Sequence, residues 1–481
     1  MEKKNPCKLL FAFLLSFLFI TICSKNSFLY PMNDWGDINC FFTVGRSLLD
    51  GKVLYRDIYE QKGPLLYFIY ALLAAISKTS FFSIYILEVI TFAFFLFYGS
   101  KCIQLYIEDN MYSYFGMIIL AFITAISKPF VHGGSVEEMM LFMQMYSIYV
   151  FLKFIKKEEQ PNKRECFTIG VFCACAFWIK YLACSFYVGL VLYILYAYCY
   201  KKKDYKTLII SIIYFLFGFC LITLIPIVYF VYTNAFVDLF TVYFYNNLFL
   251  YSSKIALWTS IPYVIIKNIK SYFFVFLILG FIYLYLYKWK ERYFISFLFA
   301  LTFVLTYASG KIHFIYYCLV LFPFSIFGVI YLLKILSTMK KNKIVLVILS
   351  LLLCISPYFI SGNTYLMKYK KTELPQYKFA KIMKDADSKT MLYFGYLDNG
   401  FYYTSQLTPT CKYFCGLNIP LQDLKDTQTE YVEDGKVDFV ITDNKTLKDY
   451  EVKDTKYKLV SKETFPFEGS EYTYYLYQLK K

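Results

Sequence analysis

Acidic and basic side chains gather in the polar segments between long apolar runs, and their types suit proton transfer and phosphate binding. A carboxylate such as Asp37 could accept a proton from a hydroxyl group. Lysine and arginine side chains could bind a phosphate and stabilise it as it leaves. A ligand that joins a phosphate to a long lipid tail would suit a site at the edge of a bilayer. These residue types therefore point to transfer chemistry, although they do not exclude a transporter.

The polar groups that could carry this chemistry lie at the ends of apolar runs or between them. They are Asp34, Asp37, Arg46, Arg56, Asp57, Glu60 and Lys62 in the first polar segment, His132, Glu137 and Glu138 in the second, Lys180 at the end of an apolar run, and Lys311, His313 and Tyr316 before a late one. The simpler explanation for each is a solvated loop charge or a membrane anchor. Lys180 argues against it, because an ionisable group beside an apolar span is costly. Glu137 and Glu138 open an apolar run, where acids favour a helix N-terminus in any case.

The composition indicates a membrane protein. Hydrophobic residues make up 59% of the 481 positions, the mean hydropathy is +0.48, and only 17% of residues are charged. Several apolar runs reach the roughly 20 residues needed to cross a hydrocarbon core of about 30 Å. Their hydrophobicity is continuous and does not alternate, so we expect them to form helices and not the strands of a barrel.

The charge and the cysteines exclude some other classes. The net charge of +16 comes from short basic runs beside apolar segments, without a nucleic-acid-binding motif, so we expect no nucleic-acid partner. Most of the 14 cysteines lie in apolar runs; Cys411 and Cys415 form an isolated C-x3-C pair. A metal site needs further ligands, and the chain has only two histidines. We therefore expect no special role for this pair, while a metal site or a disulfide there stays open.

Basic clusters beside the apolar runs set the expected topology, because positive loops stay in the cytoplasm. Lysines before the first run place the N-terminus inside, and no small-x-small cleavage site follows it. Treating the short apolar run at 63–77 as a helix that does not fully cross keeps every basic cluster inside. The eleven predicted spans are 8–29, 80–103, 111–128, 137–155, 166–180, 183–199, 207–231, 270–287, 293–309, 317–336 and 343–361. The runs at 166–180 and 183–199 could also form one long tilted helix.

Two polar regions complete the predicted fold. Residues 38–50 have helical spacing, so we expect surface helices in the first outer loop. After Gly362 the apolar runs stop: 376–386 are predicted as a helix, and 391–397 and 437–442 as short strands. The predicted fold is an all-α polytopic membrane domain of about 11–13 transmembrane helices. It covers residues 1–361 and is followed by a small extracytoplasmic α/β domain over residues 362–481.

The order of several motifs resembles the polytopic glycosyltransferases of the GT-C superfamily. Within it, the nearest type is the group of protein O-mannosyltransferases and aminoarabinose transferases, which use polyprenyl-phosphate sugars. The resemblance rests on Asp37–Gly51, with its Arg-x-x-Leu and Gly ending, on Tyr55–Tyr67, on Gly133–Glu138, on the glycine-containing span Gly170–Lys180, and on Gly310–Tyr317 followed by Pro323. It covers about residues 8–360, and each motif is expected outside the membrane.

The resemblance implies a role for each matching residue. Asp37 would be the catalytic base, with Asp34 as the alternative because Ile38 stands where the family often has a second acid. The phosphate of the donor would bind Lys62, Arg46, Arg56, Lys180 and Lys311, and the sugar or acceptor would bind Glu137, Glu138, His132, His313 and Tyr316. The loop 232–269 lacks the clear arginine that relatives often place there, and Lys254 is the only basic residue in its middle.

The implied function is inverting transfer of a hexosyl or pentosyl group from a polyprenyl-phosphate donor to a hydroxyl of a cell-envelope acceptor. The acceptor could be a glycan, a lipid or a protein. No cofactor is expected to be required, and a divalent metal stays open. We expect a multi-pass plasma-membrane protein in contact with membrane lipids, with its N-terminus in the cytoplasm. The alternatives are a flippase or other multispan transporter, and a polysaccharide polymerase or ligase. Transporters usually place polar groups near the midplane, whereas the charges here gather at one face.

Overall fold

The computed structural model describes residues 6–251, 257–268, 271–307, 314–339, 343–452, 456–467 and 470–480. Lys254, Lys311 and His313, which the sequence analysis singled out, lie outside the described residues. The chain forms two compact units. The first unit comprises Met1–Ser27, Tyr85–Ile225 and Ser253–Tyr365, and the second comprises Phe28–Ile84, Pro226–Ser252 and Leu366–Lys481. The second unit thus joins the first polar segment to the C-terminal segment. The predicted domain boundary at residue 361 separates membrane-spanning from extracytoplasmic residues. It stays a prediction.

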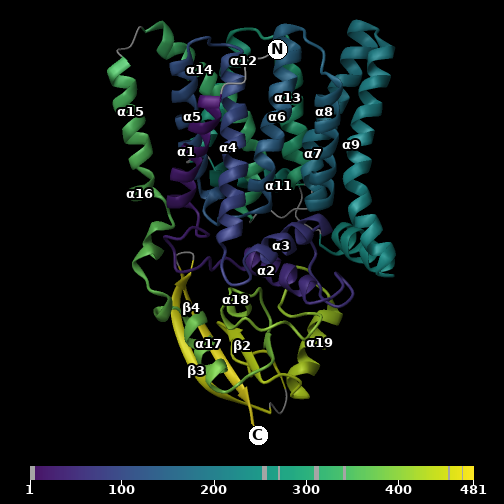
Figure 1. The fold of residues 1–481 in the computed structure, drawn as a ribbon, viewed down its shortest axis with the longest axis vertical. Helices are drawn as coiled ribbons and strands as arrows, with labels where there is room; N and C mark the ends of the chain where they lie inside the picture. Colours follow the sequence, from purple (N-terminus) through teal and green to yellow (C-terminus); the bar gives the residue numbers. More distant parts are fainter. Residues whose placement is uncertain are drawn as a thin grey trace. The chain divides into compact units, whose positions relative to one another are not determined.

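The first unit is a bundle of apolar helices (Figure 1). They are α1 (Pro6–Cys23), α4 (Phe82–Gln104), α5 (Asn110–Ala125), α6 (Val136–Lys157), α7 (Lys163–Lys180), α8 (Cys184–Tyr196), α9 (Tyr205–Tyr232, which continues into the second unit), α11 (Leu257–Asn268), α12 (Tyr272–Leu286), α13 (Arg292–Tyr307), α14 (Ile326–Thr338), α15 (Lys343–Ile355) and α16 (Pro357–Ile360). A 3-10 segment, η5 (Ile315–Ser325), leads into α14.

Each of the eleven predicted spans coincides with a helix or a helical pair of this list. Among the described residues, seven helical segments are long and apolar enough to cross a membrane, and four more apolar helices are shorter. One of the shorter ones is Pro64–Ile76, which the topology argument treats as a helix that does not cross. The mostly helical chain with a small C-terminal sheet confirms the predicted fold class.

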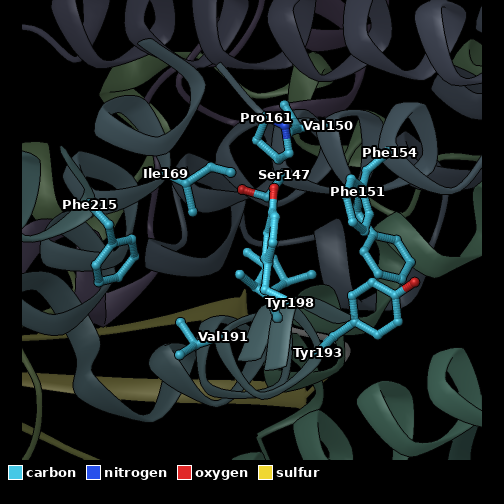
Figure 2. Close-up of a pocket in the computed structure, with 12 residues that line it drawn as sticks. Ser147, Val150, Phe151, Phe154, Pro161, Ile169, Val191, Tyr193, Tyr198 and Phe215 are labelled. Carbon is cyan, nitrogen blue, oxygen red and sulfur yellow. The ribbon is translucent and has the colours of Figure 1, made fainter. Parts of the chain in front are cut away.

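The long apolar segment around Lys180 folds back on itself. A 3-10 turn at Tyr181–Ala183 separates α7 from α8. Figure 2 shows that Pro161, Ile169 and Tyr198 line one apolar cavity. In a straight helix, Pro161 and Tyr198 would stand about 55 Å apart. The two helices are therefore antiparallel, which resolves the alternative of one long helix that the sequence left open.

Glycines let two pairs of helices in the first unit approach until their backbones touch. A Cβ atom added at Gly170 in α7 would lie 2.0 Å from the Phe215 carbonyl oxygen in α9. A Cβ atom at Gly328 in α14 would lie 2.0 Å from the Phe276 carbonyl oxygen in α12. Small residues at such contacts are how apolar helices associate where no hydrophobic driving force acts between them.

Replacing Gly328 by Ala is expected to destabilise the bundle by about 1–3 kcal/mol, because the new methyl group meets backbone and no flexible side chain. The matched control is Gly362→Ala, whose Cβ would meet only Val131 Cγ2 at 3.4 Å. Thermal unfolding of both variants in detergent measures the difference. Equal melting temperatures for the two variants would contradict the close packing of α12 and α14.

The second unit contains short helices and one mixed sheet. The elements are α2 (Gly36–Leu49), α3 (Pro64–Ile76), α10 (Phe236–Leu239), the π-helical η4 (Phe240–Leu250), α17 (Pro375–Asp385), β1 (Met391–Tyr393), α18 (Phe401–Ser405), α19 (Gln422–Glu433), β2 (Phe439–Asp443), β3 (Tyr457–Phe467) and β4 (Ser470–Leu479). The strand order is β1-β2-β4-β3, with β1 parallel to β2 and the other neighbours antiparallel. Helices α2 and α3 correspond to the short helices predicted in this part of the chain.

The buried carboxyl of Asp398 begins α18. Its Oδ1 accepts a hydrogen bond from the Phe401 backbone N–H at 2.8 Å, and its Oδ2 accepts one from Tyr402 N–H at 3.3 Å. Burial raises the pKa of Asp398 to about 7, although these hydrogen bonds oppose the shift. An unfolded Asp titrates near pH 4. Between about pH 4 and 7 the folded chain therefore holds a proton that the unfolded chain releases, so stability falls as the pH rises through this window.

Replacing Asp398 by Asn is expected to remove this dependence, because the amide oxygen still accepts from Phe401 and carries no charge. The melting temperature of the variant minus that of the wild type should rise between pH 4 and 7 and level off above. The matched control is Asp387→Asn, since the side chain of Asp387 is exposed. Parallel curves for Asp398→Asn and wild type across this range would contradict the assignment.

Candidate active site

Helix α2 carries Asp37 in its first turn, where the helix dipole favours a negative charge. The turn before it is shaped by Asn39, whose amide donates to the backbone oxygens of Asn33 and Trp35 at 2.9 and 2.8 Å. The side chain of Asp37 is buried, with the residue 7% exposed. The alternative base, Asp34, is also buried and lies within electrostatic reach of Tyr474 in β4.

Lys62 approaches α2 from the loop that precedes α3. Its Nζ atom stands 5.8 Å from the ring centre of Phe41, one helical turn after Asp37. Next to Lys62 lies Glu60, which is 2% exposed and accepts a hydrogen bond from the Lys62 backbone N–H at 3.0 Å. Burial raises the pKa of Glu60, Lys62 opposes that shift, and Asp37 adds to it. The fold therefore brings together Asp37, Glu60 and Lys62, which we call the charged triad.

Glu60 is one of the polar groups in the first polar segment, but the resemblance implies no role for it. Its spacing of two residues from Lys62 was the available signal, but only the fold shows that both side chains turn toward α2. Asp37 and Lys62 are 25 positions apart and come from different elements. Two of the predicted site residues in the second unit, Asp37 and Lys62, thus lie within electrostatic reach of Glu60, which adds a second carboxyl.

Segment η4 holds the loop that carries Glu60 and Lys62. Asn246 Nδ2 donates to the hydroxyl of Tyr59 at 3.0 Å, and Asn247 Nδ2 donates to the Gln61 carbonyl at 2.7 Å. From the loop itself, the Tyr55 hydroxyl donates to the Lys62 carbonyl at 2.5 Å. These hydrogen bonds hold the loop in one conformation. They therefore position the ammonium group of Lys62 more precisely than an unsupported loop would.

The two predicted arginines have other contacts in the second unit. Arg46 is buried and donates to the carbonyl oxygens of Tyr402 and Gln406 at 3.1 and 2.9 Å. This contact ties α2 to α18 and favours a structural role for Arg46. The side chain of Arg56 is 46% exposed and pairs with Asp57 at 3.0 Å. Phosphate binding by these two residues stays a prediction.

In the first unit, Glu137 and Lys180 form a buried ion pair. Their side chains are 1% and 11% exposed, and Lys180 Nζ stands 3.3 Å from the ring centre of Tyr317. A small cavity is lined by both charged residues, by Tyr317 and by Thr306. Among the described residues, neither Glu137 Oε2 nor Thr306 Oγ1 has a hydrogen-bond partner. The cavity has room for about one water molecule, so a larger ligand could reach these oxygen atoms only after the side chains around them move.

Two further predicted residues lie beside this cluster. The ring of His132 meets the ring of Tyr316 edge-on at 5.6 Å, and Tyr316 lies 5.7 Å from Lys180 Nζ. The structure thus brings together His132, Glu137, Lys180 and Tyr316, which come from three different predicted motifs.

Glu138 differs from its neighbour. It forms a capping box with Ser135 at the start of α6, and its Oε2 accepts from Gly134 N–H at 3.0 Å. Its carboxyl also lies beside that of Glu88 in α4, which accepts from Ser24 and Asn26. The sequence left open which of Glu137 and Glu138 faces a ligand, and these contacts favour Glu137.

Comparisons with known proteins give the class first: the chain resembles polytopic membrane glycosyltransferases of the GT-C type, as the sequence predicted. The model of the dolichyl-phosphate-mannose-protein mannosyltransferase family matches residues 111–244. The crystal structure of ArnT from Cupriavidus metallidurans bound to undecaprenyl phosphate is similar over 98% of both chains, with a TM-score of 0.57 and 10% identity. Its apo state gives the same coverage, a TM-score of 0.58 and 9% identity. No curated protein matches significantly by sequence.

These findings confirm the predicted resemblance. At 10% and 9% identity, the two structures establish a shared fold, and the family model supports the same class over α5 to η4. The chain is therefore a multi-pass membrane protein with the fold of ArnT. The roles of single residues do not follow from the fold alone.

Proposed function

We propose that this protein transfers a sugar from a polyprenyl-phosphate donor to a hydroxyl group of a cell-envelope acceptor on the outer face of the membrane. The charged triad carries this proposal. A carboxylate that can receive a proton and an ammonium that can hold a phosphate both lie within electrostatic reach of the buried carboxyl of Glu60. The family match and the fold of ArnT, which was solved with undecaprenyl phosphate, support the same donor class.

In the proposed reaction, Asp37 accepts the proton of the acceptor hydroxyl as its oxygen attacks the anomeric carbon. The attack comes from the face opposite the phosphate, and the bond from that carbon to the phosphate oxygen breaks. The configuration at the anomeric carbon therefore inverts. Lys62 stabilises the negative charge that develops on the leaving polyprenyl phosphate. Glu60, held next to Lys62, keeps this lysine oriented.

The cluster in the first unit suits the sugar or the acceptor. Glu137 and Thr306 offer oxygen atoms, and Tyr316, Tyr317 and His132 offer ring surfaces. Aromatic rings and carboxylates are common partners of sugar hydroxyls and C–H faces. We assign Lys180 to the neutralisation of Glu137 and keep its phosphate contact as a secondary role.

The proposed orientation follows from the basic segments of the chain. Lys156, Lys157, Lys163 and Arg164 flank the turn between α6 and α7, which we place in the cytoplasm. The other end of α7 carries Lys180, and this end then faces outward together with the start of α6. The N-terminus would lie inside and the C-terminal segment outside.

The decisive experiment supplies purified wild-type protein with a panel of polyprenyl-phosphate sugars and follows donor consumption. Proton NMR of the first product reports the anomeric configuration, which should be opposite to that of the donor. Retention of configuration would contradict the single displacement. If no donor is consumed by folded, monodisperse protein while it moves a lipid-linked sugar across vesicles, the transporter alternative replaces the proposal. Adding a chelator to the same assay tests whether a divalent metal takes part.

Replacing Lys62 by Gln is expected to weaken donor binding, because the phosphate loses a charge-assisted hydrogen bond of about 1.5–3 kcal/mol. This predicts a rise of roughly 10–100-fold in the Kd for undecaprenyl phosphate, measured by quenching of intrinsic fluorescence or by calorimetry. Lys78→Gln is the matched control, since Lys78 is exposed and pairs with Asp50 at 3.5 Å. An unchanged Kd for Lys62→Gln would remove Lys62 from the phosphate site.

A further inference from the structure

Two cysteines that are 375 positions apart meet in the interior of the second unit. Cys40 lies in α2, one helical turn after Asp37, and Cys415 follows α18. Their Sγ atoms are 3.5 Å apart, and the two residues are 0% and 1% exposed. A third cysteine, Cys411, is buried near Cys415. The C-x3-C pair seen in the sequence is thus part of a cluster whose closest contact is a different pair.

The cluster does not have the make-up of a metal site. Over the described part of the chain, no group of three or more His, Cys, Asp or Glu side chains could hold a metal ion. The sulfur atoms of Cys40 and Cys415 need to approach by about 1.5 Å to reach the bond length of about 2.05 Å, a shift that rotation of the side chains can supply. Both thiols are buried, and Tyr402 together with the carboxyls of Asp398 and Glu60 lies within electrostatic reach of Cys40.

We propose that Cys40 and Cys415 form a disulfide bond in the mature protein. The bond would join α2, which carries Asp37, covalently to the C-terminal segment. It adds to the non-covalent contact that Arg46 makes between the same two parts. This inference goes beyond the proposed transfer reaction but shares its outward orientation, because disulfides persist in oxidising compartments outside the cytoplasm.

The bond forms by oxidation of both thiols. Two S–H bonds break and one S–S bond forms, while two electrons and two protons pass to a protein disulfide of the extracytoplasmic exchange type, which becomes a dithiol. Burial raises the pKa of the Cys40 thiol, so the reactive thiolate is scarce once the unit has folded. The bond therefore forms as α2 and the C-terminal segment come together, and reductants reach it only when the unit opens.

The sequence makes the test unusually direct, because trypsin separates all three cysteines. Cleavage after Lys25, Arg46, Lys389, Lys412 and Lys425 gives the peptides 26–46, 390–412 and 413–425. They contain only Cys40, Cys411 and Cys415, respectively. Intact cells that express the full chain are quenched in acid, and free thiols are blocked with N-ethylmaleimide under denaturing conditions. The protein is then purified, digested without reductant and analysed by mass spectrometry.

The expected product is peptide 26–46 joined to peptide 413–425, with peptide 390–412 carrying N-ethylmaleimide. The linked species should vanish with reductant and in Cys40→Ser, and it should persist in Cys411→Ser. All three peptides carrying N-ethylmaleimide, or peptide 390–412 joined to 413–425, would overturn the proposal. Because the primary measurement uses the wild-type chain, a variant that fails to fold does not affect it.

A second readout separates this inference from the proposed function. Reductant applied during unfolding should lower the melting temperature of the wild type by about 5 °C, since the bond closes a very long loop in the unfolded chain. Cys40→Ser should show no such shift. If the wild-type protein transfers sugar normally but gives no linked peptide, the disulfide alone is refuted. A linked peptide without transfer activity would refute the proposed reaction alone.

Discussion

The variant Asp37→Asn is expected to lose sugar transfer, with kcat reduced by a factor of about 10² to 10⁴, the usual contribution of a general base. The amide has nearly the shape of the carboxyl but cannot accept the proton of the acceptor hydroxyl. The dissociation constant for undecaprenyl phosphate should change little, because Lys62 still offers its charge. Turnover of the donor in detergent and binding of the lipid phosphate, measured on the same preparation, separate the two effects.

The matched control is Asp34→Asn. This carboxyl is buried three residues earlier, before α2 begins, and lies near Tyr474. We expect this variant to keep most of its turnover. If it loses transfer while Asp37→Asn remains active, the base is Asp34 and the glycosyltransferase class is unaffected. If both variants keep their full rate, the proposed mechanism has no base in this segment and fails.

The second large effect is expected at the buried ion pair of the first unit. Replacing Lys180 by Met leaves the Glu137 carboxyl buried without its partner, which typically costs about 3–5 kcal/mol. The double variant Glu137→Gln with Lys180→Met removes both charges and should recover most of that loss, because two neutral groups of similar volume carry no such penalty. Thermal unfolding in detergent measures both. A double variant as unstable as the single one would show that packing, and not charge, holds this pair.

Activity of the double variant then separates structure from function. If Glu137 binds the sugar or the acceptor, the double variant should be folded and stable but should transfer poorly, with a raised KM for one substrate. Full activity would limit the pair to a structural role. Lys389→Met serves as the control for stability, because its partner Asp387 and Lys389 itself are 86% and 74% exposed and should contribute almost nothing.

The apolar helices are the part of the fold that the sequence predicts best. A run such as Tyr205–Tyr232 is hydrophobic all round and long enough to cross a bilayer, so local composition alone decides its structure. The reversal at Tyr181–Ala183 is harder to predict, since no Gly or Pro marks it and both flanks are equally apolar. The predicted spans break at this point, but only the packing of α8 against α7 excludes one long helix.

The small sheet was predicted in part. β1 and β2 are short apolar runs and were found within a few residues of their observed bounds. The hairpin of β3 and β4 was missed. Tyr457–Phe467 mixes lysines, Glu463 and Pro466 with its apolar residues, so its pattern resembles a loop. Pairing of β4 with β2 stabilises these strands, and a strand that depends on its neighbour leaves a weak local signal.

The candidate site also has a part that the sequence predicts and a part that only the fold shows. The sequence by itself determined a membrane protein, its helical segments, and the residue types available at their ends, because hydrophobicity and charge act locally along the chain. Only the tertiary structure decided that Asp37, Glu60 and Lys62 meet, that Glu137 pairs with Lys180 while Glu138 caps α6, and that Cys40 is the neighbour of Cys415. These contacts join residues from separate elements, and their distances depend on how helices and loops pack, which no local pattern encodes.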